Sequence, residues 1–314
     1  MNGLSEFLDN GLTIQANGQV LVGNDFKTPG YWAALAAHCR AKQIKFEKLC
    51  FYAEKTKGYA SAIALENALN GTDGYPYERK NSGATYSELV LLDSAEGTDK
   101  ANSAINSCIR RLFNSPDISG FVADLCNVIG DLHDNVWSHG QSTGFSMAQK
   151  WTDYYTQEDC FEFALADCGL GFLAELKRVG LPFQSDEESI RWCIEEGNSS
   201  KKRKNNDEWS QRLPSDIAGN PIPGIGQPVM SENAHMGLGL AKLIKLINDY
   251  SGQLWLASGE KTLVIEPNGN KSFKHNQQRW QGVALACRFE AGKVKNYKKH
   301  NDDETIKSLV ELLF

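Results

Sequence analysis

The chain lacks several features that would assign it to common protein classes. Its 314 residues contain no run of about eighteen apolar residues, which excludes an ordinary transmembrane helix. The opening MNGLSEFLDNGLTIQ has no basic start followed by an apolar stretch, so it does not resemble a secretory leader. The eight cysteines include no C-x-x-C pair and show no metal-ligand spacing, which favours reduced, mostly buried thiols. From these absences we expect a cytoplasmic protein.

Basic residues are also fewer than acidic ones. Lys and Arg total 33 against 39 Asp and Glu, so the net charge is −6 and neither nucleic acid nor an anionic membrane is an expected partner. The basic run Lys201 to Lys204 lies in a polar stretch and is typical of a solvated loop. With 41% hydrophobic residues the chain can bury a sizeable core, and its length favours two domains.

The first 85 residues alternate strand-like and helix-like patterns, which predicts a small α/β module. A glycine-rich stretch at 70–85 indicates a linker before a short strand at 88–93. The element order of the module is loosely similar to that of STAS-type domains. The predicted elements are strands at 13–15 and 19–22, a helix at 31–42, a strand at 46–52 and a helix at 60–69 that ends at Asn70-Gly71.

Two helices are predicted next, at 102–113 and from Ser115-Pro116-Asp117 to about Trp137. The second helix has two faces. Asp131, Asn135 and His139 recur every four residues and share one of them. Its core face is marked by apolar residues at three- and four-residue steps: Val122, Leu125, Ile129, Leu132 and Val136.

The polar face of this helix is the first candidate site. A carboxylate and a carboxamide one turn apart can hold a hydrated cation, and Mg²⁺ needs only one or two protein oxygens. The Asp131 carboxylate could also orient a water or a hydroxyl group. Taken alone, the pattern equally fits an exposed polar face on a long helix.

The second candidate site is a strand pattern, FEFALAD, that ends in Asp167-Cys168-Gly169-Leu170-Gly171. A carboxylate at the end of a strand can accept the exocyclic amine of adenine, and the glycines permit a tight turn and the close approach of a flat base. The alternative is an ordinary strand-turn-helix connection.

The third candidate site is the turn Gly237-Leu238-Gly239-Leu240, which opens an amphipathic helix. Glycine amides at a helix start can wrap phosphate oxygens, with help from the helix dipole. The segment is neither a P-loop nor a dinucleotide fingerprint, because Gly-Lys-Ser/Thr and Gly-x-Gly-x-x-Gly are both absent from it. The alternative is a glycine-capped helix start.

The order of these three motifs, with a long polar stretch between the second and third, resembles the GHKL superfamily of ATP-binding domains over residues 101–291. This superfamily joins gyrase-type ATPases, the heat-shock chaperone, histidine kinases and mismatch-repair ATPases. Gly197-Asn198-Ser199-Ser200-Lys201 is similar to the segment that precedes the family's lid. The resemblance implies an α/β sandwich over 86–295, a mixed sheet covered by helices on one face, a lid at about 197–233 and a tail helix at 296–314.

The resemblance also implies site residues for ATP and Mg²⁺. Asn135 would be the Mg²⁺ ligand, and Asp131 would be the catalytic acidic residue that activates water or an acceptor. Asp167 would bind adenine. The remaining cofactor-binding residues would be Gly169 and Gly171 at the base, Gly237, Gly239 and Leu240 in the phosphate turn, and Lys201 and His139 on the phosphate side.

Two departures from the family pattern affect the expected chemistry. The acidic position holds Asp131 where Glu is usual, and its shorter side chain lies farther from the γ-phosphate. The closing Gly-Thr is Gly282-Val283, and Val283 has no hydroxyl to fix adenine. These residues favour ATP binding over rapid hydrolysis.

Within the superfamily, the chain is most similar to stand-alone bacterial ATP-binding proteins related to anti-sigma-factor serine kinases. His38 is the only early histidine, and no helical hairpin follows it as in sensor kinases. We therefore expect a regulatory ATPase or protein kinase that transfers the γ-phosphoryl group to a protein or to water. The expected partner is a protein that binds the chain or accepts the phosphoryl group, and a homodimer is compatible with the resemblance. The alternatives are a non-catalytic, ATP-gated interaction switch and a fold that has lost its nucleotide.

Overall fold

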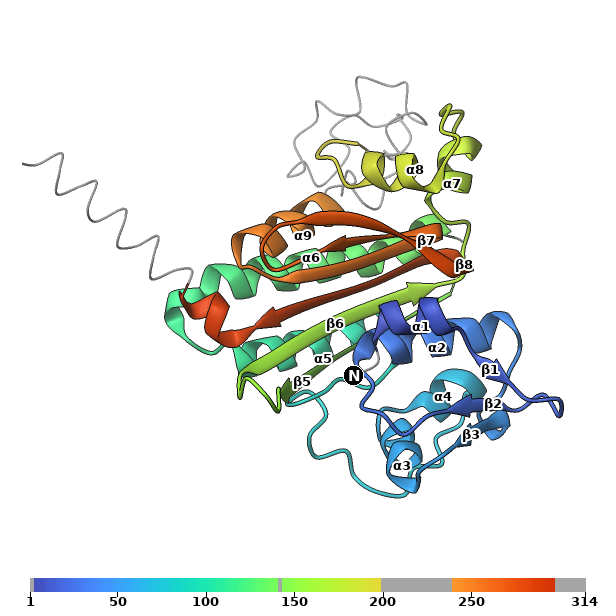
Figure 1. Ribbon diagram of the computed structural model, residues 1–314. Coiled ribbons are helices and arrows are strands. Elements are labelled where there is room, and N and C mark those ends of the chain that lie inside the picture. Colours follow the sequence, from blue (N-terminus) through green and yellow to red (C-terminus); the bar gives the residue numbers. More distant parts are fainter. Residues whose placement is uncertain (1–2, 141–142, 199–238, 297–314) are drawn as a thin grey trace, which may run out of the picture.

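The structure is a computed structural model that describes residues 3–140, 143–198 and 239–296 (Figure 1). Its N-terminal part contains a small sheet in which β2 pairs antiparallel with β1 and parallel with β3. The elements of this part are α1 (Leu4–Asn10), β1 (Thr13–Ile14), β2 (Val20–Val22), α2 (Pro29–Ala41), β3 (Leu49–Phe51), α3 (Glu54–Ala62) and α4 (Leu65–Asn70).

The larger sheet has five strands in the order β4-β5-β6-β8-β7, and every neighbouring pair is antiparallel. This overall α/β class agrees with the prediction, but the predicted mixed sheet is wrong for the described strands. The mixed pairing occurs instead in the small N-terminal sheet. The five strands are β4 (Val90–Leu92), β5 (Gly144–Thr152), β6 (Asp159–Asp167), β7 (Gln253–Ile265) and β8 (Lys271–Glu290).

One face of the large sheet packs against α5 (Ala95–Leu112), α6 (Ser119–Gly140) and α9 (Gly239–Asp249). Phe161, Phe163 and Leu165 of β6 point to this side, because alternate residues of a strand face opposite sides of the sheet. The apolar stripe predicted for α6 is confirmed: it lies in or against this core. This packing holds the polar face of α6 close to the end of β6.

The other face of the large sheet is covered by α1 and α2 from the N-terminal part. The helices α5, α6 and α9 of the predicted sandwich thus pack on one face of the sheet, and the N-terminal part covers the other face, which was not predicted. Small side chains make the close packing possible, because alanines of β6 and β8 pack against alanines of α2. A Cβ atom added to Gly30 would lie 3.0 Å from the Cβ of Ala286. The N-terminal part and the large sheet thus share one hydrophobic core.

Three predicted elements differ in detail. The strand predicted at 46–52 begins as a 3-10 helix (Phe46–Lys48) and continues as β3. The helix predicted at 60–69 is two helices, because Ala64 adopts a left-handed conformation between α3 and α4. Helix α5 starts at Ala95 rather than 102, since the Ser94 hydroxyl accepts a hydrogen bond from the amide of Gly97 and caps it.

A buried carboxylate ties the N-terminal part to the large sheet. Glu162 of β6 is 1% exposed, and its Oε1 accepts hydrogen bonds from the Thr28 hydroxyl (2.6 Å) and the Gly30 amide (2.9 Å) at the start of α2. Its Oε2 accepts two from Arg288, at 3.1 Å and 2.7 Å. The Arg288 guanidinium lies 5.1 Å from the ring centres of both Trp151 and Trp255. The carboxylate is thus paired, hydrogen-bonded and placed at a helix N-terminus, where negative charge is favoured.

We expect Glu162→Ala to lower the free energy of unfolding by about 3 kcal/mol, because it removes one partner of a buried ion pair and leaves Arg288 uncompensated. Urea denaturation measures the change. Glu187→Ala is the control, since Glu187 is partly exposed, pairs with Arg191 and Lys261 at the surface, and should shift stability by less than about 1 kcal/mol. Equal effects of the two substitutions would contradict the anchoring role of Glu162.

Candidate functional site

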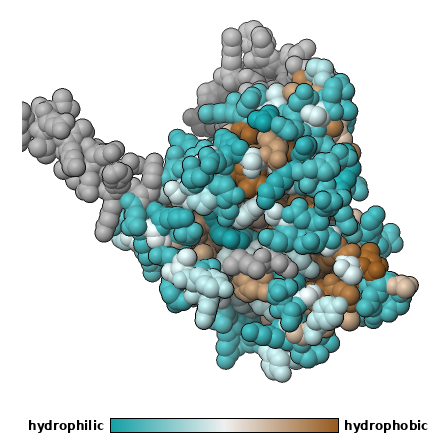
Figure 2. All heavy atoms as spheres, in the orientation of Figure 1, coloured by the Kyte–Doolittle hydropathy of each residue, from teal (hydrophilic) through white to brown (hydrophobic). Residues whose placement is uncertain are grey.

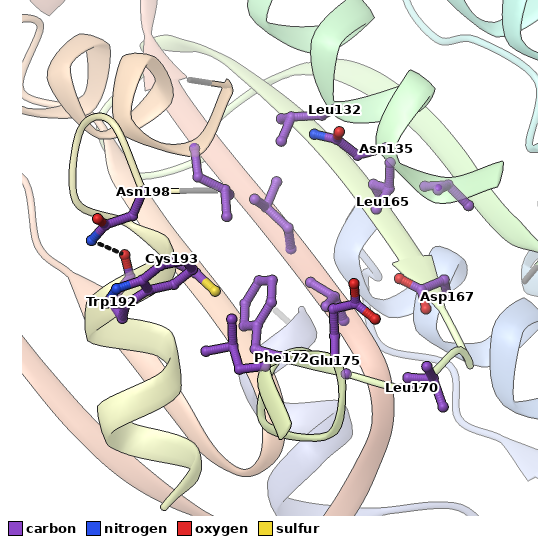
Figure 3. A pocket seen from close by; sticks show the side chains of 16 residues that line it. Leu132, Asn135, Leu165, Asp167, Leu170, Phe172, Glu175, Trp192, Cys193 and Asn198 are labelled. Carbon is purple, nitrogen blue, oxygen red and sulfur yellow. Dashed lines mark hydrogen bonds between the residues drawn. The ribbon is translucent and has the colours of Figure 1, made fainter. Parts of the chain in front are cut away.

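A largely apolar pocket opens between the large sheet and a segment that contains α7 (Phe172–Arg178) and α8 (Asp186–Cys193). Figure 2 shows hydrophobic surface in a hollow in this region, and Figure 3 shows the side chains that line the pocket. The lining comes from α6, β6, α7, α8, α9 and β8: Leu132, Asn135, Val136, Leu165, Asp167, Leu170, Gly171, Phe172, Glu175, Leu176, Trp192, Cys193, Asn198, Leu240, Val283 and Leu285.

Asp167 lies at the end of β6, and its carboxylate faces this pocket (Figure 3). Its Oδ1 accepts a hydrogen bond from the amide of Gly169 at 2.7 Å, and the amide of Val283 donates to the same carboxylate. The backbone oxygen of Asp167 accepts a bond from the Trp280 indole at 3.1 Å. These contacts fix the carboxylate in one orientation at the wall of an apolar pocket.

Glycine is required at two positions beside Asp167. Gly282 has φ of 92°, and a Cβ atom there would lie 2.6 Å from the Asp167 Oδ1. Gly171 has φ of 75°, and a Cβ atom there would lie 3.0 Å from the Ser258 Oγ. That hydroxyl already donates to the Gly282 carbonyl and accepts from the Phe172 amide, so it closes the turn. Any larger residue would displace the carboxylate or the turn.

The ionisation of Asp167 is set mainly by its burial. Burial raises the pKa of Asp167 to about 6, and the hydrogen bonds from Gly169 and Val283 only partly offset this rise. Most Asp167 side chains are therefore ionised at pH 7, so the carboxylate accepts hydrogen bonds without offering a proton. A group with two N–H bonds, such as an amidine-like edge of a base, complements it.

Helices α6 and α9 meet next to this pocket. Asn135 lines it from α6, and Asp131 lies one turn earlier, outside the lining and only 9% exposed. The Asp131 carboxylate lies 3.4 Å from the Lys242 ammonium in the first turn of α9. A Cβ atom added to Gly239 would lie 3.2 Å from the Asp131 Cβ. The polar face of α6 and the start of α9 are thus in contact.

Several predicted site residues are brought together by these elements. Asn135, Asp167, Gly171 and Leu240 line one pocket, while Gly169 contacts Asp167 and Gly239 contacts Asp131. Other predictions lie outside the described residues. They concern Lys201, Gly237, the His139 side chain, nearly all of the lid at 197–233 and nearly all of the tail helix at 296–314.

A buried histidine fixes α6 in place. His133 is fully buried, and its ring nitrogens lie 2.7 Å from the Asn102 Oδ1 and 2.7 Å from the Ser146 Oγ. Because the Asn102 Oδ1 can only accept, Nδ1 donates to it and Nε2 accepts from the serine. Burial lowers the pKa of His133 to about 3, so the ring is neutral. This network joins α6 to α5 and β5 and has no access to solvent for chemistry.

No sequence pattern predicted the wall of the pocket that α7 and α8 form. Phe172 and Glu175 on α7, and Trp192 and Cys193 on α8, all line it. Glu175 follows Gly171 by one helical turn, and its amide donates to the Gly171 carbonyl at 3.1 Å. That spacing was a usable signal for Glu175. The placement of Trp192 depends on how α8 packs, which no local pattern predicts.

Comparisons with protein-family models, with curated proteins and with solved structures gave no match. Within the described residues, no helix is both long and apolar enough to cross a membrane. The same part of the chain contains no group of three or more His, Cys, Asp or Glu side chains arranged to hold a metal ion. The site is therefore interpreted from its own geometry.

The raised pKa of Asp167 predicts a pH-dependent effect of Asp167→Asn. The folded state binds the proton more tightly than the unfolded chain, so the ionised carboxylate costs stability above pH 6, and this cost disappears as the pH falls towards 4. We expect the variant to gain on the order of 2 kcal/mol relative to wild type between pH 4.5 and pH 8.

Chemical denaturation at the two pH values measures this difference. The control is Asp99→Asn, which makes the same chemical change at an exposed position on α5. A pH-independent effect of Asp167→Asn would show that the carboxylate is not destabilised by its surroundings.

Proposed function

We propose that the protein binds Mg-ATP in this pocket as a GHKL-type ATP-binding domain and transfers the γ-phosphoryl group to a protein or to water in bacterial regulation. One observation carries the proposal: a buried, oriented and mostly ionised Asp167 at the end of a central strand, facing an apolar pocket. Adenine has a flat apolar face and an exocyclic amine, and this arrangement suits both.

The start of α9 supports a position for the phosphates. Backbone amides in the first turn of a helix lack intrahelical partners and lie at the positive end of the dipole. Leu240 brings this turn to the pocket, and Lys242 adds a cation beside it. The described pocket lining contains no Lys, Arg or His, so positive charge near the pocket comes from neighbouring groups, and Lys242 lies at this helix start.

The same region suits a magnesium ion. Asn135 offers a carboxamide oxygen to the pocket, and Mg²⁺ keeps most of its waters and takes few protein ligands when it binds phosphates. The ion would supply charge neutralisation on the phosphate oxygens. Asn135 is the residue that would hold it, and no cluster of acidic ligands is needed.

In the enzymatic form of the proposal, Asp131 is the general base. It accepts the proton of the attacking hydroxyl or water, the new oxygen–phosphorus bond forms, and the bond between the β- and γ-phosphates breaks with its electrons passing to ADP. The amides at the start of α9 and Lys242 orient the phosphates. The contact between Asp131 and Gly239 supports this role, because the proposal assigns the phosphates to the start of α9.

A second candidate function is an ATP-gated interaction switch without turnover. The Asp131 carboxylate lies 3.4 Å from Lys242 and is not part of the pocket lining, which favours a residue held in an ion pair over a free base. In this case nucleotide binding changes the surface offered to a protein partner, and no phosphoryl group is transferred.

Binding is tested by calorimetric titration of a non-hydrolysable ATP analogue with Mg²⁺. We expect Asp167→Asn to weaken binding about tenfold or more, because a hydrogen bond to a charged acceptor is lost. Asn135→Ala should abolish the dependence of affinity on Mg²⁺. The matched control is Asn127→Ala, an exposed residue two turns earlier on α6, which should bind like wild type. Absence of binding by the folded wild-type protein would refute the proposal.

Turnover separates the two candidate functions. Phosphate release from ATP, measured with wild type and Asp131→Asn, should fall at least a hundredfold in the variant if Asp131 is the base, while analogue affinity stays within a few-fold. Tight binding without turnover in both proteins, alone and with candidate acceptors, favours the switch.

A further inference from the structure

Glu175 is the second carboxylate in the described lining of the pocket, and the proposed contacts with adenine, Mg²⁺ and the phosphates do not involve it. Figure 3 shows its carboxylate directed into the pocket between Phe172 and Asp167. The side chain is only 17% exposed. Its backbone position is set by the turn that follows Asp167, since the Glu175 amide donates a hydrogen bond to the Gly171 carbonyl.

The orientation of this carboxylate is held by Arg178, one helical turn further along α7. The Arg178 Nε donates to the Glu175 Oε2 and the Nη2 to Oε1, both at 2.7 Å. Such a two-point pair fixes the plane of the carboxylate and offsets part of its charge. Each carboxylate oxygen has more than one acceptor site, so a carboxylate in a two-point pair can still accept bonds from another donor.

Electrostatics restricts which part of a nucleotide Glu175 can face. A carboxylate beside the phosphates would be repelled, and the adenine amine is already matched by Asp167. The ribose is the remaining part of the nucleotide, and its 2′- and 3′-hydroxyls are donors that a carboxylate can accept side by side. The same pairing of an acidic residue with ribose hydroxyls occurs in dinucleotide-binding folds.

We propose that Glu175 binds the ribose hydroxyls and makes the pocket selective for ribonucleotides over deoxyribonucleotides. This inference rests on the proposed nucleotide site and adds a specificity-determining residue to it. A surface ion pair between neighbouring residues of a helix, without contact to a ligand, is the competing explanation for the Glu175–Arg178 contact.

The test compares the affinities of ATP, 2′-deoxy-ATP and 3′-deoxy-ATP, each with Mg²⁺, in calorimetric titrations of the full chain. Wild type should bind ATP about tenfold or more tightly than either deoxynucleotide, because each lacks one hydrogen bond to a charged acceptor. Glu175→Gln should reduce this discrimination to below about threefold, because it weakens ATP most and weakens each deoxynucleotide less, since a deoxynucleotide keeps only one of the two hydroxyls that bond to Glu175.

The matched control is Glu290→Gln, which alters a carboxylate that also pairs with a basic residue three positions later, Lys293, at the opposite end of β6 and β8. It should keep the full discrimination. If wild type binds all three nucleotides equally, or if Glu175→Gln discriminates as well as wild type, the ribose inference is overturned and the ATP site stands. If wild type binds none of them, the proposed function itself fails. Equal binding of the three nucleotides by wild type overturns the inference even if Glu175→Gln does not fold.

Discussion

Strand β6 constrains the rest of the structure, because its two faces take part in two different cores. Phe161, Phe163 and Leu165 pack under α5, α6 and α9, while Glu162 and the alanines between them face α2. The alternation of a strand makes this possible only in one register, since a shift by one residue would place a carboxylate in the apolar core. Asp167 ends the strand on the side of α6 and α9, and the pocket forms there.

The two buried carboxylates of β6, Glu162 and Asp167, have opposite electrostatic surroundings. Glu162 is surrounded by four hydrogen bonds and an arginine, so its negative charge is matched where it lies. Asp167 has two amide donors and no basic partner among the described residues, and burial raises its pKa to about 6. A matched buried charge joins parts of a fold, whereas an unmatched one is available for a ligand. This contrast separates an anchoring residue from a candidate binding residue.

Local patterns predicted several of the elements that carry the candidate site residues. The four-residue spacing of Asp131 and Asn135 required a helix to share a face, and α6 supplies it. The glycine after Asp167 predicted a tight turn, and Gly171 indeed has a positive φ. The mixed sheet was predicted wrongly and the packing of α2 on the second face was not predicted, because pairing direction and this packing depend on contacts between residues more than a hundred positions apart.

The sequence by itself determined the residue types and their local geometry: the helix periodicity of α6, the turn after β6 and the glycine-led start of α9. Only the tertiary structure decided that Glu175 and Trp192 share a pocket with Asp167, that Lys242 reaches Asp131, and that α2 covers the second face of the sheet. The physical reason is that helix and turn preferences arise within a few residues. Pocket walls and buried ion pairs arise from the register of a sheet and from the complementary volumes of the side chains packed on it.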